Sequence, residues 1–187
     1  MVLWGFLVGL IGARLGFWLA YGTIPLSAVP KIWEGGLLSY TGILAGALTL
    51  WWYLGKYDRE NRLRWLDLCF VVGVFAWGVG RIGNYYAADS VGVLSSVWHL
   101  TYGRVPIQLF EMVVCWLIAW LGLRLLDRLP AGRTAWFVIL CYLAARFSID
   151  GWRDETSMAG LHMSQWFCLV SLVILIPLYI RHARSKN

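Results

Sequence analysis

Residues 65–86 read WLDLCFVVGVFAWGVGRIGNYY, and this stretch decides the fold class. It is long and apolar enough to cross the hydrocarbon core of a membrane, which takes about 20 helical residues. It nevertheless carries Asp67 near one end and Arg81 near the other. Placing a charged side chain in hydrocarbon costs about 2.5–3.5 kcal/mol or more, so such residues usually have a function. The stretch therefore predicts a transmembrane helix that contributes charged groups to a site.

Further apolar stretches lie on both sides of this one. The chain has 187 residues, of which 60% are hydrophobic and 14% charged, whereas a soluble domain is about half apolar and a quarter charged. The sequence predicts an all-α fold, a polytopic membrane helix bundle of about six transmembrane helices, formed as a single domain over residues 1–187. The expected spans are residues 2–20, 36–55, 66–86, 106–126, 134–150 and 163–180.

Basic residues are distributed unevenly between the connections of these spans. Three lie on one side, namely Lys31, Arg104 and Arg153. Ten lie on the other side: Lys56, Arg59, Arg62, Arg64, Arg124, Arg128, Arg133, Arg181, Arg184 and Lys186. This bias predicts that both termini are cytoplasmic. It also accounts for the net charge of +6 through orientation and anionic headgroups, so no nucleic-acid partner is expected.

Charged residues of four different spans share one depth near the outer face. They lie four to six residues inside the outer ends of these spans, which is roughly 6–9 Å at 1.5 Å per residue. Lipid phosphates lie at this depth, and arginines hold phosphate through charge-assisted, bidentate hydrogen bonds. The four residues are Arg14, Arg81, Glu111 and Arg146, and Asp150 lies just above them.

Spacing within the helices supports a cluster but leaves an alternative open. Pairs on one helix face are Arg81 with Asn84, Gln108 with Glu111, Arg146 with Asp150, and Asp150 with Arg153. In the alternative interpretation these are helix-stabilising ion pairs, with acids balancing arginines. Asp67 fits that interpretation, because an acid at the cytoplasmic start of its helix suits the helix dipole. Glu111 is expected to orient an arginine.

Several segments together resemble the prolipoprotein diacylglyceryl transferase family. They are WEGGLLSYTG (33–42), GRIGNY (80–85), PIQLFE (106–111), RFSIDGWR (146–153) and SQW (164–166). The resemblance covers nearly the whole chain. It implies an enzyme of the bacterial plasma (inner) membrane that transfers the diacylglyceryl group of phosphatidylglycerol to the thiol of a lipobox cysteine, in the signal-peptide region of a prolipoprotein. Glycerol phosphate leaves, and neither a metal nor another cofactor is expected.

The resemblance and the common depth together indicate the site residues. Arg81 and Arg146 would hold the phosphate, and Tyr40 stands where many members have a His that assists deprotonation of the thiol. Asp89 and Asp150 stand where the family usually has Glu. The expected catalytic residues are Tyr40, Arg81 and Arg146, and the expected substrate-binding residues are Arg14, Asn84, Asp89, Gly92, Gln108, Glu111, Asp150 and Arg153.

The chain also departs from the family pattern. Members have seven spans, and the first is expected to be missing here, together with most of the head between Gly92 and Val105. Val105 replaces a His, and Thr41 replaces a Gly. The open alternatives are an active minimal transferase, an enzyme of the same fold with another donor or acceptor, and a catalytically silent lipid-binding membrane protein or a fragment of a longer gene product. A transporter is disfavoured, because one outer-facing polar cluster offers no path through the membrane.

Overall fold

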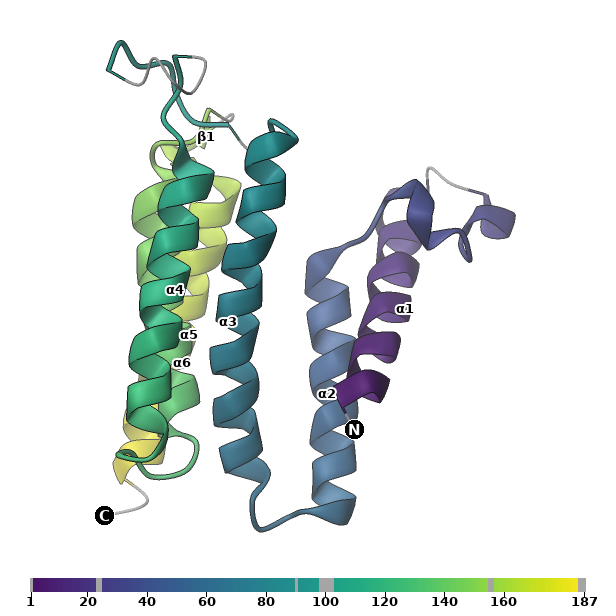
Figure 1. Cartoon of the computed structure of the whole chain (residues 1–187), viewed down its shortest axis with the longest axis vertical. Coiled ribbons are helices and arrows are strands. Elements are labelled where there is room, and N and C mark those ends of the chain that lie inside the picture. The colour runs from purple at the N-terminus through teal and green to yellow at the C-terminus, as the bar shows by residue number, and fades with distance from the viewer. Residues whose placement is uncertain (1, 23–24, 90, 98–102, 155–156, 185–187) are drawn as a thin grey trace. The chain divides into compact units, whose positions relative to one another are not determined.

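The computed structural model describes residues 2–22, 25–89, 91–97, 103–154 and 157–184. Six long helices follow one another, each ending within four residues of the predicted bounds, and the predicted all-α membrane bundle is confirmed (Figure 1). They are α1 (Val2–Tyr21), α2 (Ser39–Tyr57), α3 (Arg62–Tyr86), α4 (Ile107–Leu126), α5 (Arg133–Asp150) and α6 (Met163–Arg184). The short elements are the 3₁₀ turns η1 (Leu26–Ala28) and η2 (Ile32–Glu34) and the strands β1 (Ser157–Met158) and β2 (Leu161–His162).

The long helices suit a bilayer. Within the described residues, α1, α3, α4 and α6 are long and apolar enough to cross a membrane by length and composition. The chain forms two compact units, Met1–Arg62 and Leu63–Asn187, which are described separately. The single domain expected over residues 1–187 stays a prediction.

The first unit is an antiparallel hairpin of α1 and α2. Glycines let the two backbones approach closely, as small-residue patterns do in membrane helices. A Cβ atom added to Gly9 would lie 3.1 Å from the carbonyl oxygen of Gly42, and one added to Gly16 would lie 2.0 Å from Oγ1 of Thr41. Small residues therefore form the face on which α1 and α2 pack together.

The second unit builds its core between α3, α4 and α5. The buried side chains of this core are apolar and small, which lets the helices pack tightly. Its members are Val71, Val74, Cys115, Ile118, Ala119 and Val138. α6 packs on α5.

One end of this unit is held by polar side chains from α3. The fully buried Asp67 accepts hydrogen bonds from the backbone N–H groups of Gly132 and Ala135, both at 2.7 Å. Arg64 donates to the carbonyl oxygens of Leu126 and Leu129, where α4 ends. Asp67 was expected to suit the dipole of its own helix, but the N–H groups it satisfies belong to the start of α5. Its role is structural as predicted, and the helix that it caps is a different one.

At the opposite end of the unit, short extended segments pair above the helices. Val93 N–H donates to Trp152 O, and Asp154 N–H donates to Val91 O, both at 3.0 Å. The N–H group of Val105 donates to the carbonyl oxygen of Val93, also at 3.0 Å. The segments that follow α3, precede α4 and follow α5 thus form one layer of backbone hydrogen bonds, here called the outer layer (residues 91–94, 104–105 and 152–154).

Candidate active site

Five charged residues of the second unit form an unbroken chain of ion pairs at the end that carries the outer layer. We call this set the arginine–carboxylate cluster: Arg81, Glu111, Arg146, Asp150 and Arg153. Arg81 Nε lies 3.1 Å from Glu111 Oε2, and Arg146 Nη1 pairs with Glu111 Oε1. Asp150 accepts from Arg146 Nε at 2.8 Å, and its other oxygen lies 2.9 Å from Arg153 Nη2. The charges therefore alternate along the chain.

The position of each member follows from the helix ends. Arg81 lies near the end of α3, Glu111 near the start of α4, and Arg146 near the end of α5, so antiparallel packing brings them to one level. Their side chains are 8%, 4% and 12% exposed, respectively. The predicted convergence of these three residues is observed within the second unit.

The cluster carries an excess of positive charge. Three guanidinium groups face two carboxylates, which leaves a formal charge of +1 in a buried environment. Among the described residues, no hydrogen bond uses the terminal nitrogens of Arg81 or the Nη2 atom of Arg146. Guanidinium groups in this state bind phosphate or carboxylate oxygens by charge-assisted hydrogen bonds. The arrangement is therefore suited to one further anion.

Two aromatic residues that sequence reasoning missed complete the surroundings of Glu111. Trp77 Nε1 donates to Glu111 Oε1 at 2.9 Å, and the Tyr142 hydroxyl lies 3.3 Å from the same oxygen. A signal for them was present, because each aromatic residue precedes an arginine by four positions on its helix, Trp77 before Arg81 and Tyr142 before Arg146.

Other predicted site residues shape the connection between α3 and α4. The buried Gln108 donates from Nε2 to the carbonyl oxygen of Asp89 at 2.7 Å. Asp89 N–H in turn donates to the carbonyl oxygen of Asn84 at 3.0 Å. The Asn84 side chain is half-buried, one turn after Arg81 on α3, whereas the Asp89 side chain is exposed.

Gly92 lies where the backbone leaves no room for a side chain. A Cβ atom there would lie 2.3 Å from the carbonyl oxygen of Val105, closer than any real contact. Arg104 Nη1 also donates to Gly92 O at 3.0 Å, and the same nitrogen pairs with Asp154 at 2.6 Å. Only glycine therefore permits the outer layer to close at this position, and the part in substrate binding expected of Gly92 stays a prediction.

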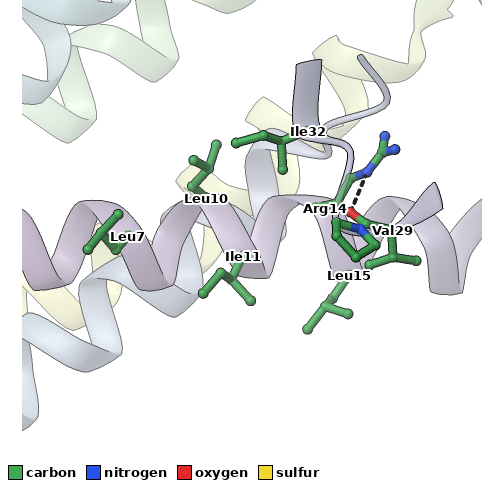
Figure 2. Close-up of a pocket in the computed structure, with 8 residues that line it drawn as sticks. Leu7, Leu10, Ile11, Arg14, Leu15, Val29 and Ile32 are labelled. Carbon is green, nitrogen blue, oxygen red and sulfur yellow. Dashed lines mark hydrogen bonds between the residues drawn. The ribbon is translucent and has the colours of Figure 1, made fainter. Parts of the chain in front are cut away.

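Arg14 lies in the first unit and has different partners. It is 2% exposed, and its guanidinium donates to five backbone carbonyl groups of the connection between α1 and α2. Figure 2 shows it bonded to Val29 at the edge of an apolar pocket of about 330 Å³. The five carbonyl groups belong to Ala28, Val29, Lys31, Gly35 and Gly36. Its expected approach to the residues of the second unit stays a prediction.

Tyr40 lies in the first turn of α2, and its side chain is outside the described part of the structure. Its expected role in deprotonating the thiol also stays a prediction.

Comparison with known proteins identifies the family. The model of the family "prolipoprotein diacylglyceryl transferase" matches residues 1–181. The chain belongs to the prolipoprotein diacylglyceryl transferase family. This confirms the resemblance seen in the five sequence segments and makes the chain a multi-pass membrane protein of a transferase family.

Similar members come from several bacteria, and each is named phosphatidylglycerol–prolipoprotein diacylglyceryl transferase. The protein of Streptococcus mutans is 29% identical, over 98% of this chain and 78% of its own length. That of Lactococcus lactis is 28% identical, over 100% of this chain and 78% of its own length. That of Pseudomonas aeruginosa is 26% identical, over 100% of this chain and 79% of its own length. The family likeness therefore extends over the helices that carry the arginine–carboxylate cluster.

Proposed function

We propose that this chain transfers the diacylglyceryl group of phosphatidylglycerol to the thiol of a lipobox cysteine in a prolipoprotein. Membership of the transferase family supports the proposal, as do the relatives that carry this activity in their names. The observation that carries it is the arginine–carboxylate cluster, which holds an excess positive charge at one end of a membrane helix bundle. An anionic phospholipid is the membrane component that suits such a site.

Arg81 and Arg146 hold the lipid phosphate in this proposal. The carbon–sulfur bond forms as the bond between the glycerol carbon and the phosphate oxygen breaks, and glycerol phosphate departs with the electron pair. Negative charge grows on the departing phosphate, and preorganised guanidinium groups stabilise it without further reorganisation. Glu111 and Asp150 hold the arginines in place through the ion pairs described above.

The acceptor thiol must lose its proton before it attacks. A net positive site favours the thiolate over the thiol. We propose that the Tyr40 hydroxyl assists this step by relaying the proton, giving up its own proton to the departing glycerol phosphate as it takes the proton of the thiol; the proposal rests on its place in the WEGGLLSYTG segment. Replacing Tyr40 with Phe tests this role, because the ring remains and only the hydroxyl is lost; a near-normal rate would show that the thiolate forms without it.

The remaining site residues have supporting roles in the proposal. Asn84 lies one turn after Arg81 on α3 and faces the headgroup. Arg153 pairs with Asp150 and contributes a third positive charge to the cluster. Gln108, Asp89 and Gly92 hold the outer layer above the lipid headgroup. Arg14 holds the α1–α2 connection that leads to Tyr40, because all five of its N–H donors are already bound to carbonyl groups there.

We propose in addition that the protein lies in the bacterial inner membrane with both termini in the cytoplasm and the cluster open to the outer leaflet. The ten-to-three distribution of basic residues supports this orientation. Single cysteines at Glu60 and Ser95, in a variant without the native cysteines, distinguish the two sides. An impermeant thiol reagent applied from outside should label position 95 and leave position 60 unlabelled, and the reverse pattern would overturn the topology.

A reconstituted transfer assay tests the activity. The purified protein is placed in bilayers of phosphatidylglycerol or of phosphatidylethanolamine, with a lipobox peptide as acceptor. We expect the peptide to gain one diacylglyceryl group, with equimolar release of glycerol phosphate, only when phosphatidylglycerol is present and the peptide retains its cysteine. Transfer from the other lipid would indicate a different donor. Binding of phosphatidylglycerol without transfer to any lipobox peptide would indicate a silent lipid-binding protein.

A further inference from the structure

Trp77 contacts both members of the Arg81–Glu111 pair. Its indole N–H donates to Glu111 Oε1 at 2.9 Å, and the centre of its ring lies 4.9 Å from Arg81 Cζ. The edge of the same ring meets the ring of Tyr142, with centroids 6.2 Å apart at 77°. A neutral side chain of α3 therefore touches a cation, an anion and an aromatic neighbour of the cluster at once.

These contacts restrict the Glu111 carboxylate. The terminal torsion of a glutamate is broad and has no strong intrinsic preference. Arg146, Trp77 and Tyr142 donate to one oxygen of Glu111, while Arg81 pairs with the other oxygen, so the four groups together determine the carboxylate plane. An indole N–H can only donate, and it adds no charge to the cluster. It therefore orients the carboxylate without competing for the anion that the arginines are suited to bind.

We infer that Trp77 is a positioning residue: its N–H group orients the Glu111 carboxylate, and its ring supports the Arg81 guanidinium, so that Arg81 and Arg146 present their free N–H groups to a lipid phosphate. The inference rests on the proposed role of the cluster in holding that phosphate. It assigns to Trp77 a function separate from filling space between α3 and α4.

Two replacements separate the N–H group from the ring. Trp77→benzothienylalanine keeps the shape of the bicyclic ring and removes only the N–H group, and Trp77→Phe also reduces the ring. The readout is the affinity for a short-chain fluorescent phosphatidylglycerol, measured by anisotropy in phosphatidylcholine nanodiscs, together with kcat/KM for the lipobox peptide. We expect both quantities to fall by about tenfold in the isosteric variant, as for loss of a hydrogen bond to a charged acceptor, while the protein stays folded at the temperature of the assay.

Trp120 supplies a matched control. It lies on α4 four residues before Arg124, whose Cζ is 5.2 Å from its ring, so it repeats the tryptophan–arginine contact outside the cluster. Trp120 is 52% exposed. The same two replacements at Trp120 should leave lipid affinity and kcat/KM unchanged. Equal effects at Trp77 and Trp120 would overturn the inference.

Coupling to Glu111 gives the deciding comparison. If Trp77 acts through Glu111, replacing Trp77 in a Glu111→Gln background should change lipid affinity by less than about twofold, as expected for two residues of one network. A full tenfold loss in that background would overturn the inference. If the unsubstituted protein binds phosphatidylglycerol but performs no transfer, the proposed activity fails while the affinity measurements still test Trp77.

Discussion

The α1–α2 hairpin and the α3–α6 unit each bury arginine, but the hydrogen-bond acceptors around the guanidinium groups differ between the two units. In the hairpin, the five N–H groups of Arg14 are taken up by five backbone carbonyl groups of one connection. In the second unit, Arg81 and Arg146 share Glu111, and Arg146 also pairs with Asp150. A guanidinium has five donors, so the first arrangement is saturated, whereas the second retains donors and an excess positive charge.

We propose that this difference separates an arginine that orders the chain, Arg14, from two arginines that bind an anion, Arg81 and Arg146. Carbonyl dipoles satisfy the hydrogen bonds of Arg14 and order the chain around it. Carboxylates shared among three arginines orient the guanidinium groups while leaving part of their hydrogen-bonding capacity for an anion. Burial alone, which is similar for Arg14 and Arg81 at 2% and 6% exposure, does not distinguish the two.

The largest effect is expected from Glu111→Gln. Arg81 would lose its carboxylate partner and become a buried, uncompensated charge, while Arg146 would keep only Asp150. Breaking a buried ion pair in this way typically destabilises a protein by about 3–5 kcal/mol. Unfolding of the purified protein in mixed micelles would measure the change in free energy. Glu60→Gln, at an exposed position, serves as the control and should have almost no effect. A similar small effect for both variants would mean that the cluster does not hold the second unit together.

Arg146→Lys and Arg14→Lys form a pair that tests the comparison directly. Lysine keeps the charge but loses the planar, bidentate fork. At Arg146 we expect the activation barrier for transfer to rise by roughly 3–4 kcal/mol, as for loss of a preorganised donor. At Arg14 we expect a smaller change in kcat and faster hydrogen exchange in residues 28–36, because the connection loses carbonyl partners. Equal losses of kcat for the two variants would contradict the division into structural and binding arginines.

Glycine substitutions distinguish how the two units pack. Gly16→Ala places a Cβ atom against Thr41 in the hairpin, and such overpacking should cost about 1–3 kcal/mol of unfolding free energy. At Gly73 in α3, no atom of the described residues outside the neighbouring helix backbone lies within 4 Å of where a Cβ would be, so Gly73→Ala should stabilise the helix by about 0.5–1 kcal/mol. Thermal unfolding of both variants provides the measurement. A neutral Gly16→Ala would show that the hairpin can separate without loss.

The smallest loss of stability is expected from Asp67→Ala. The variant loses the cap on α5, which usually costs about 1 kcal/mol and up to 2 kcal/mol. Asp127→Ala removes an exposed acid after α4 and is the control. Hydrogen exchange at Gly132 and Ala135 should rise in the first variant alone. Faster exchange near the cluster instead would mean that Asp67 supports the site and not only the α4–α5 turn.

The outcome at individual residues shows how far sequence reasoning reached. Hydrophobic length predicted all six helices, because each span must satisfy its own backbone hydrogen bonds within the bilayer. Counting residues from the helix ends predicted correctly that Arg81, Glu111 and Arg146 lie together, because residues at equal distances from the same end of packed helices lie at the same level. Trp77 was missed, because its place four residues before Arg81 was not a specific signal: Trp120 stands in the same relation to Arg124 outside the cluster, so the spacing alone does not identify the indole that donates a hydrogen bond to Glu111.

The sequence by itself determined the helices, their family and the depth at which the charges lie, since these depend on residue type and position along one helix. Only the tertiary structure decided which groups each charge contacts. It placed Arg14 among carbonyl groups of its own connection, turned Asp67 toward α5, and joined Trp77 to Glu111. The physical reason is that hydrogen-bond partners depend on distances of about 3 Å between elements remote in sequence. Packing of the helices sets these distances, and the residue pattern within a single helix does not predict them.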